Sequence, residues 1–429
     1  MKIESYHVYR LIFGLMLVLI IGSLIVGLLS FITESFGSFW DYPSIEISEW
    51  LINYEGGFVR RGICGQLLYI LYQFHPYPIR NVIVFFYIMG FLVISGVLFN
   101  LFKKEGWSIY IIPFPICLYY AFSCNLLWTR RDYWVLLWAF LIYYLYFKFI
   151  KTGSLLILLV LFVLSVLVLL THEASFFFIF PILIVHSLYY LFKEKKKCLY
   201  LISFWSFLFC VFFIIILHKG NSDIASVIWN SWEPCFRTYS THNGIIPNLG
   251  RGVEFLEMNT IDTIRFHFGL VWLAQFAPSI PSFPFNIYLI ICTYYLVTRL
   301  NTIDLRLYKL KSVDNILLSN ILILQFIFLI PMFGFLSCDL GRIIPYWIIS
   351  SLFLLHIIKQ SETSFLFPNF VEIISLWAQK KIDNIKALNK SWVYCICIVS
   401  LPLDCYYGAS YMGIFPIHYL MRIIHYYYL

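Results

Sequence analysis

The stretch EGGFVRRGICG, residues 55–65, sets two adjacent arginines, Arg60 and Arg61, between glycines. Glycine lets the backbone approach a ligand closely, and paired guanidiniums present charged forks that match phosphate or carboxylate. The pattern therefore predicts an anion site. A basic, glycine-broken turn at the lipid headgroups would use the same residues, so the rest of the chain has to separate the two interpretations.

A second ionisable pair, His172 and Glu173, lies in the short turn LTHEAS between two strongly apolar segments. Ionisable groups at such depth are costly and by default face a polar cavity, which makes this pair a candidate for general acid–base catalysis. The alternative is a helix start capped by Thr171, with Glu173 favourable to the helix dipole. The turn lacks the second histidine of a HExxH zinc helix, which excludes a metalloprotease.

Two further turns combine arginine with a carboxylate. The turn WTRRDYW contains Arg130 and Arg131, and the turn SCDLGR contains Asp339 and Arg342. The first is also typical of an aromatic membrane boundary, and Asp339 and Arg342 are spaced to pair within one helical turn. The functional alternative places all of these groups around one outer cavity with the first arginine pair.

The composition indicates a polytopic membrane protein. The chain has 429 residues, 61% of them hydrophobic and 12% charged, with a mean hydropathy of +0.84. Its net charge of +8 does not indicate nucleic-acid binding, because the cations are scattered between apolar segments as topology signals are. Most of the cysteines lie inside apolar runs without metal-ligand spacing, so we expect no structural zinc and no other metal or cofactor.

Hydropathy in windows of about 19 residues predicts an all-α fold with roughly eleven transmembrane helices in a single transmembrane domain, residues 1–429. The first apolar run is longer than a signal-peptide core and lacks a cleavage site, so we expect it to be retained. Two short apolar stretches, 63–74 and 266–277, are expected to be re-entrant or interfacial. The predicted crossings are 9–31, 81–102, 109–128, 133–150, 154–170, 174–192, 198–218, 284–297, 316–336, 343–358 and 392–412.

Lysine and arginine divide between the two predicted sides of the membrane. With a cytoplasmic N-terminus, the inner loops carry the lysines, and the outer loops carry arginines, with Lys219 as the exception. An excess of positive charge on the inner side supports this orientation. Arginine is the better residue for bidentate anion recognition, so the outer face is predicted to carry the chemistry.

Two predicted outer loops are long. Residues 32–80 form the first periplasmic loop, which holds the Arg60-Arg61 pair and the short segment 63–74. Residues 219–282 form the larger one, whose tryptophans and asparagines could stack on sugar faces and pair with hydroxyls. An ordinary interfacial loop has a similar composition. The candidate sugar-binding residues are Trp229, Trp232 and Asn243.

The motif GFVRRG, the His172-Glu173 pair and the turn from Asp339 through Gly341 to Arg342 together resemble the O-antigen or capsule repeat-unit polymerases, the Wzy class. The resemblance covers the multi-helix plan and these three motifs, although the central loop is shorter than in many members. It implies a GT-C-like helical bundle in the bacterial inner membrane. It also implies a periplasmic site that transfers a glycan from one undecaprenyl-diphosphate carrier to another lipid-linked repeat unit without a required metal, alongside a flippase and a chain-length regulator.

A polymerase of this kind needs cations for the leaving diphosphate and a base for the acceptor hydroxyl. We therefore expect Glu173, assisted by His172, or alternatively Asp339, to act as the base. The diphosphate ligands would be Arg60, Arg61 and Arg342, with Arg130 and Arg131 in reserve.

Two other functions stay open on the sequence. A glycosyltransferase of the GT-C type would use a polyprenyl-linked donor and an acidic residue in the first outer loop, where Asp41, Glu46, Glu49 and Glu55 are available. A flippase of lipid-linked sugar would be expected to carry charged or broken sites near the membrane midplane and an internal repeat. The charges lie instead at one predicted face, and no repeat is visible.

Overall fold

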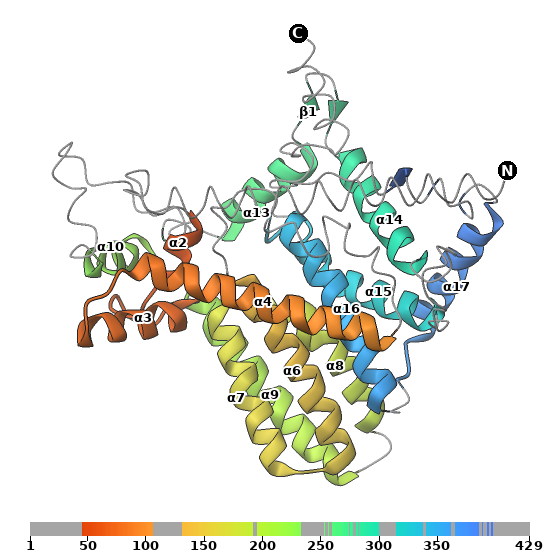
Figure 1. The fold of residues 1–429 in the computed structure, drawn as a ribbon, viewed down its shortest axis with the longest axis horizontal. Coiled ribbons are helices and arrows are strands. Elements are labelled where there is room, and N and C mark those ends of the chain that lie inside the picture. Colours follow the sequence, from red (N-terminus) through yellow and green to blue (C-terminus); the bar gives the residue numbers. More distant parts are fainter. Residues whose placement is uncertain are drawn as a thin grey trace.

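A computed structural model gives the fold of the chain (Figure 1). It describes residues 45–105, 131–191, 195–232, 260–273, 275–277, 280–281, 283–299, 315–337, 340–361 and 365–385, together with Val253, Leu256, Leu388, Val393, Ile396 and Cys397. Within these ranges the regular secondary structure is helical, apart from the short antiparallel pair β1 (Gln275–Ala277) and β2 (Ile280–Pro281).

Four consecutive helices form a bundle in the lower half of Figure 1. They are α6 (Asp132–Thr152), α7 (Leu155–Thr171), α8 (Ser175–Leu191) and α9 (Lys195–Leu217). Gly153, with φ 68°, ends α6 and allows the tight turn into α7. Short connections make successive helices antiparallel, so the bundle has two chemically different ends.

We call these the arginine end and the lysine end. The arginine end contains the start of α6 and the turn between α7 and α8, and it presents Arg131 and the His172-Glu173 pair. The lysine end contains Lys148, Lys151 and Lys197, and Lys197 Nζ donates a 2.9 Å hydrogen bond to the last turn of α6 at the Ile150 carbonyl. Among the described residues of the bundle, Arg131 and these three lysines thus lie at opposite ends.

The remaining helices surround this bundle. α16 (Leu340–Ser361) packs against α6 and α15 (Asn315–Leu329), and α17 (Asn369–Asn384) packs on α15. α4 (Ile79–Glu105) crosses the upper part of the bundle in Figure 1 and contacts α6. The other described elements are α2 (Ile45–Trp50), α3 (Gly62–Phe74), α10 (Ser222–Ser231), α13 (Thr260–Phe268), a π-helical turn (Gly269–Leu273), α14 (Phe283–Arg299) and a 3₁₀ turn (Ile330–Met332).

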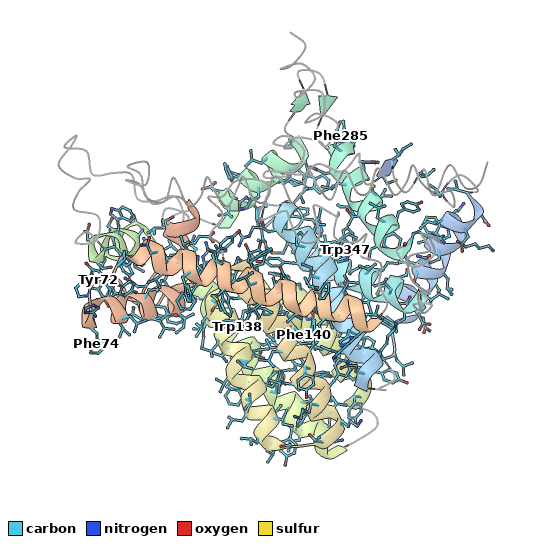
Figure 2. The ribbon with its side chains drawn as sticks, viewed as in Figure 1. Tyr72, Phe74, Trp138, Phe140, Phe285 and Trp347 are labelled. Atoms are coloured by element: carbon cyan, nitrogen blue, oxygen red, sulfur yellow. The ribbon has the colours of Figure 1, made fainter. Side chains whose placement is uncertain are left out.

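Buried side chains gather in two cores. The larger core joins α4, α6–α9 and α14–α16, and Trp347 of α16 lies among these helices (Figure 2). The smaller core joins α2, α3, the start of α4 and α10, and it contains Trp50, Trp229 and Trp232. The smaller core thus fixes the loop that carries Arg60 and Arg61 between α2 and α3.

Four described helices are long and apolar enough to cross a membrane, at 81–101, 132–152, 197–217 and 342–361. Three shorter apolar helices lie at Leu155–Thr171, Ser175–Tyr190 and Ile316–Met332. Seven predicted crossings coincide with these seven helices, and an eighth, 284–297, coincides with α14, which is not one of them. The predicted crossings 9–31 and 109–128, and nearly all of 392–412, lie outside the described residues.

The two short apolar stretches fold differently from each other. Segment 63–74 falls within α3, a single helix that leaves Leu67, Leu71 and Phe74 exposed along one side. Segment 266–277 contains the end of α13, the π-helical turn and β1, so it is not one helix. The sequence could not predict this division, because apolar composition over 12 residues does not specify a backbone conformation.

Candidate functional site

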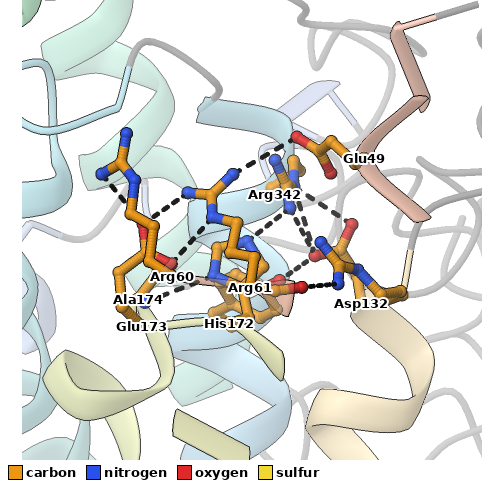
Figure 3. Close-up of polar contacts among 10 residues, drawn as sticks. Glu49, Arg60, Arg61, Asp132, His172, Glu173, Ala174 and Arg342 are labelled. Carbon is orange, nitrogen blue, oxygen red and sulfur yellow. Dashed lines mark hydrogen bonds and ion pairs between the residues drawn. The ribbon is translucent and has the colours of Figure 1, made fainter. Parts of the chain in front are cut away.

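The three motifs singled out in the sequence meet at the arginine end of the bundle (Figure 3). Arg60 and Arg61 come from the loop before α3, and His172 and Glu173 come from the turn between α7 and α8. Arg342 comes from the first turn of α16. Residues more than one hundred positions apart in sequence therefore form a single polar cluster.

Arg61 and Glu173 form the centre of the cluster. Arg61 Nε donates to Glu173 Oε2 at 2.7 Å, and Arg61 Nη2 donates to Glu173 Oε1 at 2.7 Å. Arg60 Nη1 adds a longer contact of 3.3 Å to the same Oε1 atom. Two parallel bonds between a guanidinium and a carboxylate make a strong, geometrically specific pair. The carboxylate of Glu173 is thus shared by both adjacent arginines.

The glycines of the arginine loop serve close packing. A Cβ on Gly62 would lie 2.2 Å from the Tyr54 ring, and one on Gly65 would lie 2.0 Å from the Ile52 carbonyl oxygen. Arg61 itself has φ 65° and caps the start of α3 in the left-handed conformation, which is unfavourable for a residue with a Cβ. The loop is therefore held in a demanding conformation by packing against residues 50–54.

A second fork joins Arg342 to Asp132 across the arginine end. Arg342 Nε donates to Asp132 Oδ2 at 3.0 Å, and Nη2 donates to Oδ1 at 2.9 Å. Tyr346, one turn along α16, also donates its hydroxyl to Asp132. Arg342 thus pairs with α6, whereas the sequence had suggested a pair with Asp339 in its own turn; Asp339 lies outside the described residues.

His172 connects the two forks. Its Nδ1 atom faces the backbone N–H of Ala174 at 3.2 Å, and its Nε2 atom faces Arg342 Nη2 at 2.8 Å. Both ring nitrogens therefore face donors, so the single N–H of the neutral ring has no acceptor among these two contacts and a second ring proton would have none either. Burial, together with the nearby Arg61 and Arg342 charges, lowers the pKa of His172 well below its ordinary value. The imidazole is consequently neutral in this arrangement.

Opposing effects act on Glu173. Burial by itself raises the pKa of this carboxyl, but the charges of Arg61 and Arg60 outweigh burial and hold the pKa well below its ordinary value. Glu173 is therefore a carboxylate while the arginines are in place. Because efficient general bases have a pKa near the operating pH, Glu173 can act as one only after its arginines turn to another anion.

Arg131 lies beneath the arginine loop with only 1% of its surface exposed. Its Nη1 atom donates to the Arg61 carbonyl oxygen at 3.1 Å, and its guanidinium lies 5.9 Å from the centre of the Trp50 ring. These contacts hold the backbone of Arg61. Arg131, one of the predicted diphosphate ligands, is thus buried and supports the Arg61 backbone. Arg130, the other predicted reserve ligand, lies outside the described residues.

Three further residues, which the sequence did not assign to the cluster, pair with its arginines or lie within reach of their charge. Glu49 Oε1 lies 3.5 Å from Arg61 Nη1, and Asp132 binds Arg342. His267 of α13 is buried, and burial together with Arg61 and Arg60 lowers its pKa to about 4. Glu49 and Asp132 were visible as acids in predicted outer segments, but nothing in the spacing marked His267.

The structure corrects the sugar-binding prediction. Trp232 is fully buried and donates its ring N–H to the Leu51 carbonyl oxygen at 2.7 Å, and Trp229 is buried beside it in the smaller core. A ring covered on both faces cannot stack on a sugar. These tryptophans instead anchor α10 to the arginine loop, and Asn243 lies outside the described residues.

Within the described ranges, no group of three or more His, Cys, Asp or Glu residues is arranged to hold a metal ion. The cluster instead offers four guanidiniums against the three carboxylates of Glu49, Asp132 and Glu173. With His172 neutral, one positive charge remains in excess among the described residues of the cluster. Such a site suits an anion that can displace a carboxylate from an arginine fork.

Comparison with known proteins adds no assignment: the chain matches no family model, no curated protein and no solved structure.

Proposed function

We propose that the chain is an O-antigen, or surface polysaccharide, polymerase that joins undecaprenyl-diphosphate-linked oligosaccharide repeat units. The observation that carries this proposal is the convergence of Arg60, Arg61, His172, Glu173 and Arg342 in one cluster. These residues belong to the three motifs on which the resemblance to the Wzy class depends. A cluster of arginines and acid–base groups at one end of a membrane bundle suits transfer from a lipid diphosphate.

In this proposal the acceptor hydroxyl attacks the anomeric carbon of the donor glycan. The bond between that carbon and the diphosphate oxygen breaks, and undecaprenyl diphosphate leaves with the bonding electrons. Arg60 and Arg61 turn from Glu173 to the diphosphate and stabilise its developing charge. Freed of its arginines, buried Glu173 becomes a stronger base and takes the hydroxyl proton, assisted by His172, with Asp339 as the alternative base.

Arg342 has a different place in the proposed reaction. Asp132 and Tyr346 already occupy it, and its Nη2 atom faces His172. Arg342 therefore orients His172 in the resting site, and it reaches the diphosphate only if Asp132 releases it. Arg131 supports the Arg61 backbone.

The proposed setting is the bacterial inner membrane, with roughly eleven crossings, a cytoplasmic N-terminus and the cluster on the periplasmic side. The separation of arginine and lysine between the two ends of the α6–α9 bundle supports this orientation. A flippase would deliver the lipid-linked units to the same side, and a chain-length regulator would act on the product.

The test is a gel of surface polysaccharide from a deletion strain carrying wild-type protein, Arg61→Ala or Arg265→Ala. Arg265 is highly exposed and its ion pair is with Asp262, which is not a residue of the cluster, so its variant is the matched control. We expect the deletion to leave a single repeat unit, wild type and Arg265→Ala to restore the ladder, and Arg61→Ala to fail at normal expression. A deletion that removes even the single unit would exclude a polymerase.

Glu49 favours a second candidate, a GT-C-type glycosyltransferase. This acid lies in the predicted first outer loop, where that class places its catalytic carboxylate, and it is buried against Arg61. Transfer of one sugar from a polyprenyl-linked donor, lost in Glu49→Gln and retained in Glu173→Gln, would favour this candidate over the polymerase. A lipid-linked oligosaccharide flippase is the third candidate, and no particular contact supports it.

A further inference from the structure

Helix α17 is turned with its polar side toward the protein and its apolar side outward. Val371, Ser375 and Gln379 lie on one face of the helix and are buried. Phe370, Ile373 and Trp377 lie on the opposite face, with 52%, 65% and 62% of their surfaces exposed. A helix that packs on a soluble protein shows the reverse pattern.

Specific polar contacts fix this orientation. Ser375 Oγ donates to Ser319 Oγ of α15 at 2.5 Å, and Gln379 Nε2 donates to the Tyr294 hydroxyl of α14 at 3.2 Å. Near the end of α17, Asp383 forms an ion pair with Arg299, the last residue of α14. Rotating the helix to bury its apolar side would break all three contacts, so the outward apolar face is built into the fold.

The outward face changes character along the helix. It is apolar from Phe370 to Trp377, and Ile374 and Leu376 add further exposed apolar surface. Lys380 and Lys381 follow on the same side and are exposed. Because an α-helix rises about 1.5 Å per residue, the lysines lie roughly 15 Å along the axis from Phe370. The order is therefore apolar side chains, then tryptophan, then two cations.

We propose that α17 is a membrane-docking helix, with Phe370 and Ile373 in the acyl layer, Trp377 at its boundary and Lys380 and Lys381 on anionic lipid headgroups. Tryptophan prefers the boundary between acyl chains and headgroups, and lysines next to an apolar face bind anionic lipid. The lysine charges select an anionic lipid surface over a second protein surface as the partner. This inference is independent of the proposed polymerase activity.

The position of α17 fits this role. It is the outermost helix on the right of Figure 1 and packs mainly on α15. Its length and composition do not qualify it as a crossing, and it lies between the predicted crossings 343–358 and 392–412. A helix that enters one leaflet obliquely, without spanning the bilayer, reconciles its modest average hydropathy with its exposed apolar face.

The test uses full-length protein in nanodiscs that contain phosphatidylglycerol and lipids brominated at either shallow or deep acyl positions. The emission of Trp377 is obtained as the difference between wild type and Trp377→Phe. We expect shallow bromines to quench most of this emission. Phe370→Trp, placed in the Trp377→Phe background, is expected to be quenched more by deep bromines. Trp232→Phe is the control, because fully buried Trp232 should be quenched by neither.

The lipid charge is tested separately. In nanodiscs of phosphatidylcholine alone, and in the Lys380→Gln/Lys381→Gln variant with phosphatidylglycerol, we expect the quenching of Trp377 to fall. Quenching that is equal in all of these samples would overturn the headgroup assignment. Trp377 emission that no bromine quenches, in protein with wild-type helicity, would overturn the whole inference and indicate that protein covers this face.

Discussion

Arg61 holds Glu173 by two 2.7 Å hydrogen bonds, one to each carboxylate oxygen, across 112 residues of sequence. The pair joins the loop before α3 to the turn between α7 and α8, so it is at once a structural link and the centre of the cluster. A diphosphate can reach the Arg61 fork only by taking the place of Glu173. In the resting site, carboxylates of the protein thus largely neutralise the charges of the arginines.

Anion binding should be accompanied by proton uptake. When pyrophosphate takes Arg60 and Arg61, the charges that lower the pKa of Glu173 are withdrawn and burial raises that pKa instead. We expect up to about one proton to be taken up per bound pyrophosphate at mildly acidic pH. Calorimetry in buffers of different ionisation enthalpy measures this quantity. The same uptake in Glu173→Gln would show that the proton goes elsewhere, whereas no pyrophosphate binding at all would count against the arginine site itself.

The left-handed backbone of Arg61 should make glycine a better replacement than alanine. Both changes remove the ion pair with Glu173, but only alanine keeps the cost of a Cβ at φ 65°. We expect Arg61→Gly to be more stable than Arg61→Ala by about 1 kcal/mol, with both variants inactive. Thermal unfolding of the two proteins in the same detergent gives the comparison. Equal stabilities would mean that the loop relaxes away from this conformation.

Asp132 and Arg342 should be strongly coupled. Each is mostly buried, so removing one partner leaves an uncompensated charge. We expect Asp132→Asn and Arg342→Gln each to destabilise the fold by roughly 3 kcal/mol, and the double variant to cost less than their sum. Arg265→Gln is the matched control, because its pair with Asp262 is exposed and should change stability by less than about 0.5 kcal/mol. Additive single effects would contradict the described fork.

Stability should fall as the pH drops below neutral. The pKa of His267 in the fold is about 4, below its ordinary value of 6.5, so the unfolded chain binds more protons between these values. The free energy of unfolding is then constant above about pH 6.5 and decreases toward pH 4, by at most about 1.4 kcal/mol per pH unit from this residue. His267→Gln should make the thermal-unfolding profile less steep in that window, where His172, whose pKa is also lowered, still contributes. An unchanged profile would mean that His267 is accessible to protons in the fold.

The sequence predicted the chemical groups of the cluster better than their partners. Arg60, Arg61, His172, Glu173 and Arg342 were identifiable because charged residues are rare and costly in an apolar chain. Their pairing could not be identified from the sequence, because the Arg61–Glu173 and Arg342–Asp132 ion pairs depend on how α3, α6 and α16 pack. His267 gave no signal, because a single histidine after an arginine has no diagnostic spacing.

Two features of the fold were beyond reach of the composition. Trp232 was wrongly predicted to bind sugar, and the outward apolar face of α17 was not predicted, because composition reports what a segment contains and not which side it turns inward. The ring of Trp232 is needed to fill the smaller core, and the polar side of α17 is needed to pair with α14 and α15. Averaged hydropathy carries neither piece of information.

The most direct test of the account uses purified protein in nanodiscs with undecaprenyl-diphosphate-linked repeat units as the only substrate. We predict products of increasing length together with released undecaprenyl diphosphate, and loss of both in Arg61→Ala protein of normal helicity. Polymer formation by Arg61→Ala at the wild-type rate would contradict the role of the arginine cluster. Wild-type protein that forms no polymer, but transfers one sugar from a polyprenyl-linked donor, would contradict the polymerase proposal itself.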